Sequence, residues 1–411
     1  MVSFEWLISP VTPEQFFSDY FEREALLIEG KPSKFSSVLS IAAIDRYLAN
    51  TSPCHPDVFL VDAARELKVE DYAYPNSQPP GRLDLPRVYQ LFASGSTISL
   101  GQMQEQLLEL AALCRAAEKV FSCHFQTNIY LSPPNAQGFK THYDSHDVFA
   151  LQVSGSKVWT IYDTPIELPL RGQAFEPDKH APGPATRELT LHAGDVFYCP
   201  RGLLHAARST DESSLHITLG LIGKTWADVM TEAISEACLA SPAFRKTLPI
   251  GFANAGFDIS AAETTFRSLV DTFAREAQLG PILARLAEGF VTSHRPDLQG
   301  CLQEVDVAPQ VTADSRVAPR PHIIYQLRAD KENVEVLFGS TQITLPSHAR
   351  ETLEAALGSK APFVVRDLPG DLDDDGKVVL VRRLIKEGLL VRREGVAAQR
   401  PARAAEAMMV Q

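Results

Sequence analysis

Two histidines and one aspartate in this sequence are spaced in a way that could bind a divalent metal ion. His142 and Asp144 are two residues apart, and His205 follows 61 residues after Asp144. On a β-strand, residues two apart point to the same face of the sheet, so the first two side chains could share one ion. Two imidazoles and one carboxylate on one face of an octahedral ion, with the other face open, are typical of non-haem Fe(II) oxygenases. The third ligand would come from a distant strand.

Sheet structure is expected on both sides of the His-x-Asp pair. Residues 125–131 have the composition of a strand, and residues 132–138 are rich in turn residues. The pair is therefore expected to open a new strand. Residues 147–153 and 157–162 are two further strand patterns, joined by a short link that contains Gly155 and fits a β-hairpin.

The third histidine follows two predicted turns. Gly194-Asp195 precedes a short apolar stretch, and Pro200-Arg201-Gly202 comes directly before Leu203-Leu204-His205. Glycine and proline at these positions are typical of tight turns. Each turn would fix the direction from which His205 approaches the ion.

The alternative to a metal site is a chance pair of surface residues. A single His-x-Asp pair is more often structural than functional, and the turns before His205 are what favour a site here. His146 offers a second alternative, because His142, Asp144 and His146 would share one strand face. A strand rises ~3.3 Å per residue, so His146 would begin ~13 Å from His142. We therefore expect His146 to have a structural or supporting role.

These stretches resemble the JmjC/cupin-type 2-oxoglutarate oxygenases, and in particular the ribosomal oxygenase branch, which hydroxylates ribosomal proteins. The matching segments are residues 128–139, 142–149, 151–159 and 193–205. The resemblance implies a double-stranded β-helix (jelly-roll) barrel with His142, Asp144 and His205 as the Fe(II) ligands and catalytic centre. It implies 2-oxoglutarate and O2 as cosubstrates. It further implies that Lys157 binds the distal carboxylate of 2-oxoglutarate and that Tyr130 hydrogen-bonds to it.

The proposed role of Lys157 has a physical basis in the strand pattern. Trp159 and Ile161 alternate with Lys157 and are apolar, so the ammonium group would point inward with them. An unpaired buried lysine is costly, and a dicarboxylate would supply its partner. The alternative is a lysine at a hairpin start that reaches solvent. Tyr130 has its own alternative as an aromatic strand residue with one solvated end. Some bacterial members of the family have arginine at the position of Lys157.

Composition agrees with an ordinary globular enzyme of two to three domains. The 411 residues are 45% hydrophobic and 22% charged, and no stretch has the length of a membrane span. The first residues lack the order of a secretion signal. Six widely separated cysteines do not suggest a disulfide framework, so we expect a cytoplasmic protein with no membrane partner. Cys199 is near His205 without a Cys-x-x-Cys motif, which favours buried packing.

The charge is concentrated in the predicted catalytic part. Residues 1–300 contain 24 Lys and Arg against 35 Asp and Glu, whereas residues 301–411 contain 15 against 16. An acidic surface disfavours nucleic acid and favours basic polypeptides such as ribosomal proteins, although acidity for solubility alone is the alternative.

Four segments are predicted for this α+β chain. Residues 1–222 would form the catalytic barrel with N-terminal helices, among them one that begins at Thr12 and one over residues 101–114. Helical patterns at 226–239 and 261–290 lie in a second segment, 223–300, which the resemblance implies is a helical dimerisation region of a homodimer. Residues 301–395 would form a winged-helix-like domain, and residues 396–411 a disordered tail.

Local patterns support a separate C-terminal domain. Residues 333–338 and 342–345 suggest a hairpin, residues 347–357 and 377–388 two helices, and residues 389–393 a strand. An acidic run, Asp371-Leu-Asp-Asp-Asp-Gly376, matches the first half of an EF-hand loop, but Arg382 stands where a bidentate Glu is required. We interpret this run as the acidic entry to the following helix.

Three functions remain open from the sequence. The first is a hydroxylase of a ribosomal protein that acts on Arg or His, or a demethylase with the same iron chemistry. The second is a hydroxylase of a small molecule or precursor peptide, because one fold serves many substrates. The third is a non-catalytic cupin-like binding protein, which the complete ligand set and Lys157 disfavour.

Overall fold

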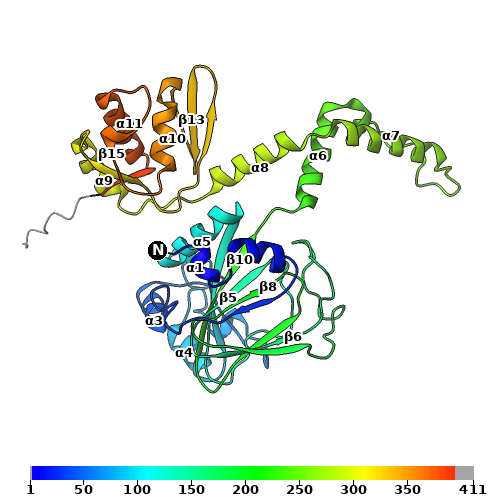
Figure 1. Cartoon of the computed structure of the whole chain (residues 1–411). Coiled ribbons are helices and arrows are strands. Elements are labelled where there is room, and N and C mark those ends of the chain that lie inside the picture. Colours follow the sequence, from blue (N-terminus) through cyan, green and yellow to red (C-terminus); the bar gives the residue numbers. More distant parts are fainter. Residues whose placement is uncertain (1, 394–411) are drawn as a thin grey trace, which may run out of the picture. The chain divides into compact units, whose positions relative to one another are not determined.

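The computed structural model describes residues 2–393, which belong to two compact units (Figure 1). The first unit covers residues 1–290 and the second begins at Val291. The predicted division of the chain at residues 222 and 300 stays a prediction, and the predicted tail, 396–411, lies outside the described residues. Within the described range, no helix has the length and apolar character that crossing a membrane requires.

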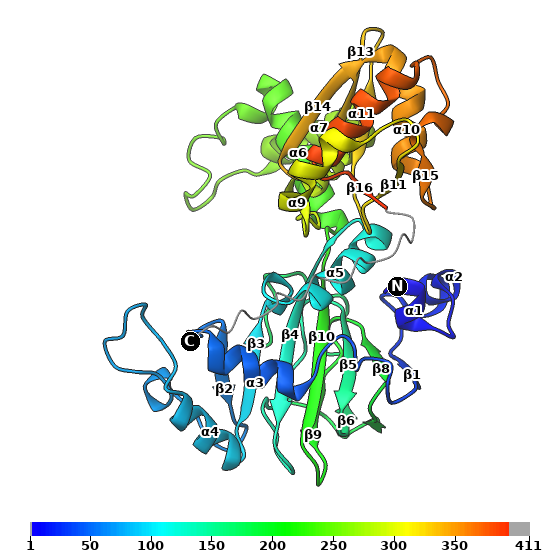
Figure 2. The same cartoon turned by 90° about the vertical axis from the view of Figure 1, so that its left-hand side faces the viewer.

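The first unit is built on a seven-stranded antiparallel sheet, whose central strands lie side by side in Figure 2. Strands β4 and β10 pair along their full length, from Ser132 opposite Ser214 to His124 opposite Ile222. In sheet order the strands are β1 (Leu26–Ile28), β8 (Val196–Cys199), β5 (Val148–Ser154), β10 (Ser214–Ile222), β4 (His124–Ser132), β3 (Thr97–Gly101) and β2 (Val58–Val61).

A three-stranded sheet completes the barrel. Its order is β7 (Arg187–Leu191), β6 (Lys157–Ile161) and β9 (His205–Ser209). Ala150 and Phe197 of the large sheet form one buried cluster with Trp159 and Leu191 of the small sheet. The two sheets therefore pack face to face, and the predicted jelly-roll of an α+β protein is confirmed.

N-terminal helices pack on the outer face of the large sheet. An aromatic cluster of Phe4, Phe16 and Phe121 reaches Phe149 on β5, with Phe4 edge-to-face and Phe16 tilted against the Phe149 ring. Thr12 Oγ1 accepts a hydrogen bond from the Gln15 N–H, as the predicted helix cap requires. The helices are α1 (Phe4–Ile8), α2 (Pro13–Gln15), the π-helix η1 (Phe16–Tyr20), α3 (Ile41–Asn50), the short 3₁₀ helix η2 (Val69–Asp71), α4 (Leu85–Ala93), the 3₁₀ helix η3 (Met103–Glu105) and α5 (Leu108–Phe121).

The helix predicted from Gly101 is wrong at its start. Gly101 ends β3, Gln102 has a left-handed backbone with φ of 52°, and α5 begins only at Leu108. The Gln104 N–H donates to Thr127 Oγ1, and Gln104 Oε1 accepts from the Thr127 N–H. These bonds hold the segment against β4, so an α-helix cannot continue through it.

Three helices follow the barrel: α6 (Trp226–Ala240), α7 (Ser260–Glu276) and α8 (Leu279–Ser293), with the short 3₁₀ helix η4 (Pro242–Arg245) after α6. The pattern at 226–239 is confirmed as α6, and the pattern at 261–290 is two helices, because Ala277 has an extended backbone. Thr225 and Asp228 cap α6 with reciprocal hydrogen bonds.

The second unit has its own core and two small sheets. The predicted hairpin is confirmed as β13 (Asn333–Phe338) and β14 (Thr341–Pro346), which β12 (Gln326–Ala329) extends. Asp373 Oδ1 accepts from the Gly376 N–H at the start of α11 (Asp374–Lys386), so the acidic run is a helix entry, as predicted. The remaining elements are α9 (Cys301–Val307), η5 (Ala308–Gln310), β11 (Arg316–Pro319), η6 (Ser347–Ala349), α10 (Arg350–Gly358), β15 (Phe363–Val364), η7 (Val365–Asp367), α11 (Asp374–Lys386) and β16 (Leu390–Arg392).

Candidate metal and cosubstrate site

The two halves of the predicted metal site meet through a single backbone bridge. His142 lies in the segment between β4 and β5, and His205 begins β9. The His142 N–H donates to His205 O at 3.1 Å, and the His205 N–H donates to His142 O at 2.8 Å. The prediction that His142 opens a regular strand is wrong, since β5 begins at Val148. One antiparallel bridge brings His142 beside His205.

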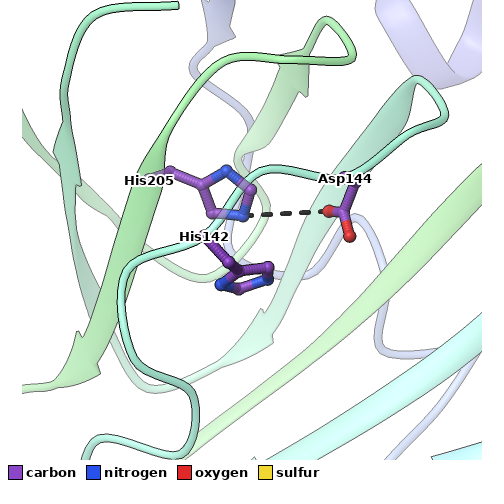
Figure 3. Close-up of side chains that lie close together, drawn as sticks. All are labelled: His142, Asp144 and His205. Carbon is purple, nitrogen blue, oxygen red and sulfur yellow. Dashed lines mark ion pairs between the residues drawn. The ribbon is translucent and has the colours of Figure 1, made fainter. Parts of the chain in front are cut away.

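His142, Asp144 and His205 turn their side chains toward one another (Figure 3). One ligand atom from each lies within 4.8 Å of the other two, and His205 Nε2 is 3.8 Å from Asp144 Oδ2. Among the described residues they are the one such group of three or more. The donor set of two imidazoles and one carboxylate fits Fe(II) with coordination positions left for other ligands.

Backbone carbonyls fix the orientation of both imidazoles. His142 Nδ1 donates to Lys140 O at 2.8 Å, and His205 Nδ1 donates to Leu203 O at 3.0 Å. The lone pair of each Nε2 is then free for a metal ion. Burial lowers the pKa of His205 to about 4, with a further contribution from His142 and an opposing one from Asp144. His205 is thus neutral, as a metal ligand must be.

The predicted turns position these ligands. The Gly202 N–H donates to Asp144 O at 2.9 Å and so ties the turn before His205 to the second ligand. Asp195 accepts from the His192 N–H with one carboxylate oxygen and from the Gly30 N–H with the other. The Gly194-Asp195 turn is therefore anchored to the segment after β1.

The three ligands line a cavity of about 240 Å³ inside the barrel. Lys157 and Tyr130, the predicted 2-oxoglutarate residues, line the same cavity. So does His146, which packs where Gly220 leaves room for its ring and is not one of the clustered ligands. The lining residues are Thr97, Asn128, Tyr130, Gly138, Phe139, His142, Asp144, His146, Val148, Lys157, Trp159, Cys199, His205, Ala207, His216 and Thr218.

Lys157 is a buried ammonium group whose hydrogen-bond partners among the described residues are neutral. Lys157 is 3% exposed. Within the described part of the chain, its Nζ contacts Ser132 Oγ at 3.1 Å and His216 Nδ1 at 3.4 Å. Burial lowers the pKa of Lys157 to about 7. A dicarboxylate in the cavity would supply the missing negative charge, so the residues present fit 2-oxoglutarate.

His216 is a site residue that the sequence reasoning missed. It stands opposite Tyr130 in the β10–β4 register, and the two rings stack at 4.9 Å between centroids. Burial, followed by the charge of Lys157, lowers the pKa of His216, so its neutral ring can accept from the ammonium group. Ser214, His216 and Thr218 alternate along an apolar strand. That alternation of polar residues was the available signal.

Tyr130 remains a neutral donor, because burial and then Asp144 raise the pKa of its phenol. Cys199 is buried, and its Sγ is 3.7 Å from His205 Nδ1, which agrees with the expected packing role. All six cysteines lie in the described part of the chain and are free thiols.

Residues 100–229 match the family model of the JmjC domain, and this range contains all five predicted site residues. Together with the jelly-roll fold and the His-Asp-His cluster, this match shows that residues 100–229 form a JmjC domain, whose donor set and cavity fit the Fe(II) and 2-oxoglutarate of a 2-oxoglutarate-dependent oxygenase.

The similar proteins include a ribosomal oxygenase and several proteins named bifunctional lysine-specific demethylase and histidyl-hydroxylase NO66. The chain is 27% identical over 94% of its length to the bifunctional lysine-specific demethylase and histidyl-hydroxylase NO66 of Aedes aegypti, and 28% identical over 94% to ribosomal oxygenase 1 of Bos taurus. It spans 67% and 64% of those proteins, and 38% of the NO66 protein of Drosophila melanogaster.

A solved structure of YcfD, a ribosomal oxygenase from Escherichia coli in complex with cobalt and 2-oxoglutarate, superimposes with a TM-score of 0.54. The identity is 13%, and the match covers 94% of this chain and 99% of that chain. At this identity the likeness establishes a shared fold.

Proposed function

We propose that this protein hydroxylates an Arg or His side chain of a ribosomal protein, with succinate and CO2 as coproducts. The observation that carries the proposal is a single cavity that holds both the His142, Asp144, His205 cluster and the unpaired ammonium group of Lys157. The relatives named as ribosomal oxygenase and histidyl-hydroxylase support the substrate class.

The chain's own residues have separable roles in this reaction. When bound, Fe(II) with 2-oxoglutarate and O2 supplies the oxidising power for inserting oxygen into an unactivated C–H bond. His142, Asp144 and His205 would hold the metal. Lys157 would bind the distal carboxylate as an ammonium group, and Tyr130 would donate its phenolic proton to the same carboxylate in a hydrogen bond. The apolar walls, such as Trp159, exclude water.

A basic polypeptide substrate is supported by the charge of the chain. The net charge is −12, which attracts cationic segments and repels nucleic acid. A cytoplasmic location, where ribosomal proteins are made, is part of the same proposal.

We also propose that the protein is a homodimer and that its second unit is winged-helix-like. Trp226, Met230 and Phe266 on α6 and α7 are 71%, 52% and 67% exposed, which supports a dimerisation surface on these helices. The helices α10 and α11 with the β13–β14 hairpin support the second assignment (Figure 1).

Reconstitution tests the proposed reaction directly. Protein loaded anaerobically with Fe(II) is mixed with 2-oxoglutarate, O2 and the separated ribosomal proteins. We expect succinate to form together with a mass gain of one oxygen atom on one basic ribosomal protein, located by tandem mass spectrometry. Loss of a methyl group from an N-methylated lysine would instead identify demethylation.

The matched control is Asp144→Ala, which removes one metal ligand without touching Lys157. It should form neither succinate nor the modified protein. If the active protein forms succinate only with a small molecule or short precursor peptide, and no ribosomal protein gains oxygen, the substrate proposal is wrong and the oxygenase class stands.

A further inference from the structure

The two segments that carry the metal ligands are joined by a partly buried ion network. Asp147 lies three residues after Asp144, and Arg201 lies four residues before His205. Arg201 Nη1 donates to Asp147 Oδ2 at 2.7 Å and to Glu22 Oε1 at 2.5 Å. The network thus connects both ligand segments with the segment before β1.

Both oxygens of the Asp147 carboxylate are bonded. Tyr198 Oη donates to Asp147 Oδ1 at 2.6 Å and accepts from the Glu22 N–H at 2.9 Å. Asp147 and Tyr198 are 1% and 0% exposed. Burial opposes the charge of Arg201, but its hydrogen bonds to Glu22 and Asp147 raise its pKa, so the guanidinium stays charged. A buried charge with such partners has one well-defined geometry.

Two consecutive residues of the turn hold the segment that contains Asp144. The side chain of Arg201 bonds to the side chain of Asp147, and the N–H of Gly202 donates to Asp144 O at 2.9 Å. The Gly202 contact lies at Asp144 itself, and the Arg201 contact lies at Asp147, three residues further along the chain. The position of Asp144 relative to His205 therefore depends on this turn as well as on the His142–His205 bridge.

We infer that Arg201, acting through Asp147, is a positioning residue that sets the spacing of Asp144 and His205 for the metal ion. Buried ion pairs contribute little net stability compared with apolar side chains, so stability alone is a poor explanation for this one. Groups that orient metal ligands commonly change metal affinity by about 10- to 100-fold when they are removed. The inference rests on the metal site of the proposed function.

Cobalt(II) binding tests this inference without turnover. We expect Arg201→Met and Asp147→Asn each to weaken Co(II) binding about 10-fold and to change the visible absorption spectrum of the bound ion. Arg201→Lys keeps a cation and should recover part of the affinity. Glu22→Gln leaves the Arg201–Asp147 pair intact, so it should lower the unfolding temperature at most and keep the wild-type Co(II) spectrum.

The matched control is Arg208→Met, which removes an exposed arginine from the strand that begins with His205. It should bind Co(II) like the wild type. Wild-type affinity and spectrum in both Arg201→Met and Asp147→Asn, whatever their unfolding temperatures, would overturn the inference. If Arg201→Met does not fold, Asp147→Asn decides, because it preserves side-chain size. Failure of the wild-type protein to bind Co(II) would contradict the proposed function instead.

Discussion

Among the described residues that line the cavity, Lys157 is the one lysine or arginine, and cosubstrate affinity should depend on its ammonium group. Lys157→Met removes a charged hydrogen-bond donor, so we expect the KM for 2-oxoglutarate to rise by about 10- to 100-fold. Folding should be unaffected or improved, since an apolar side chain would replace a buried cation. Steady-state kinetics and chemical denaturation measure the two effects.

Two variants control the Lys157 experiment. Lys157→Arg keeps the charge and should retain part of the affinity, whereas Lys119→Met removes an exposed lysine of α5 and should change nothing. An unchanged KM for 2-oxoglutarate in Lys157→Met would contradict the proposal that this residue binds the cosubstrate.

Proton uptake should accompany 2-oxoglutarate binding to the Co(II)-loaded protein. Burial lowers the pKa of Lys157 to about 7, so at about pH 8 most free protein has lost this proton. A bound carboxylate favours the charged form and raises the pKa in the complex. Binding then takes up a proton at about pH 8 and none at about pH 6, and affinity falls as the pH rises above the free-state pKa.

Titration calorimetry in two buffers with different ionisation enthalpies measures this uptake. The observed heats should differ between buffers at the higher pH and agree at the lower pH, and Lys157→Met should abolish the difference. Equal heats at both pH values would mean that Lys157 is already charged in the free protein.

Sequence reasoning identified the side chains of this site better than their surroundings. His142, Asp144 and Lys157 could be named because motif spacing and strand alternation depend on near neighbours in the sequence. His216 was missed, since its role arises only where β10 pairs with β4 and places it beside Tyr130. The partners of Arg201 could not be predicted either, because Glu22 is far from it in the sequence.

The Pro200-Arg201-Gly202 turn has a strict backbone requirement at its glycine. Gly202 has a φ of 88°, and a Cβ there would collide with the carbonyl oxygen of Ile166. Gly202→Ala should therefore lower the free energy of unfolding by about 1–3 kcal/mol or more. It should also weaken Co(II) binding, because the turn carries the bond to Asp144 and leads into His205.

Gly172→Ala is the matched control for this turn, since a Cβ at that position meets no atom within 4 Å. Urea denaturation should separate the two variants clearly. Equal stability of Gly202→Ala and Gly172→Ala would show that the turn rearranges freely. It would contradict the claim that this turn fixes the direction from which His205 approaches the metal ion.

Elements with regular side-chain alternation were predictable, and those fixed by tertiary contacts were not. The β13–β14 hairpin and the cap at Thr12 followed from local patterns that the structure retains. The helix expected from Gly101 begins at Leu108, because hydrogen bonds between Gln104 and Thr127 override local propensity.

In the assembled protein, the apolar surface of α6 and α7 should be covered by a second copy. Trp226, Met230 and Ile234 lie four residues apart and share one side of α6, and Phe266 and Val270 do the same on α7. All five are exposed in the single chain. Clusters of exposed apolar side chains mark interfaces, and burying one large side chain contributes about 1.5–3 kcal/mol.

The double variant Phe266→Glu/Val270→Glu tests this arrangement against Thr264→Glu/Ser268→Glu, which adds the same charges on another side of α7. All four positions are exposed, so neither variant buries a charge in the single chain. Sedimentation equilibrium should give a dimer for the wild type and the control and a monomer for the Phe266/Val270 variant. A wild-type monomer at every concentration tested would contradict the proposed homodimer. A dimer that survives the Phe266/Val270 variant would instead place the interface elsewhere, since two introduced carboxylates cannot be buried together without partners.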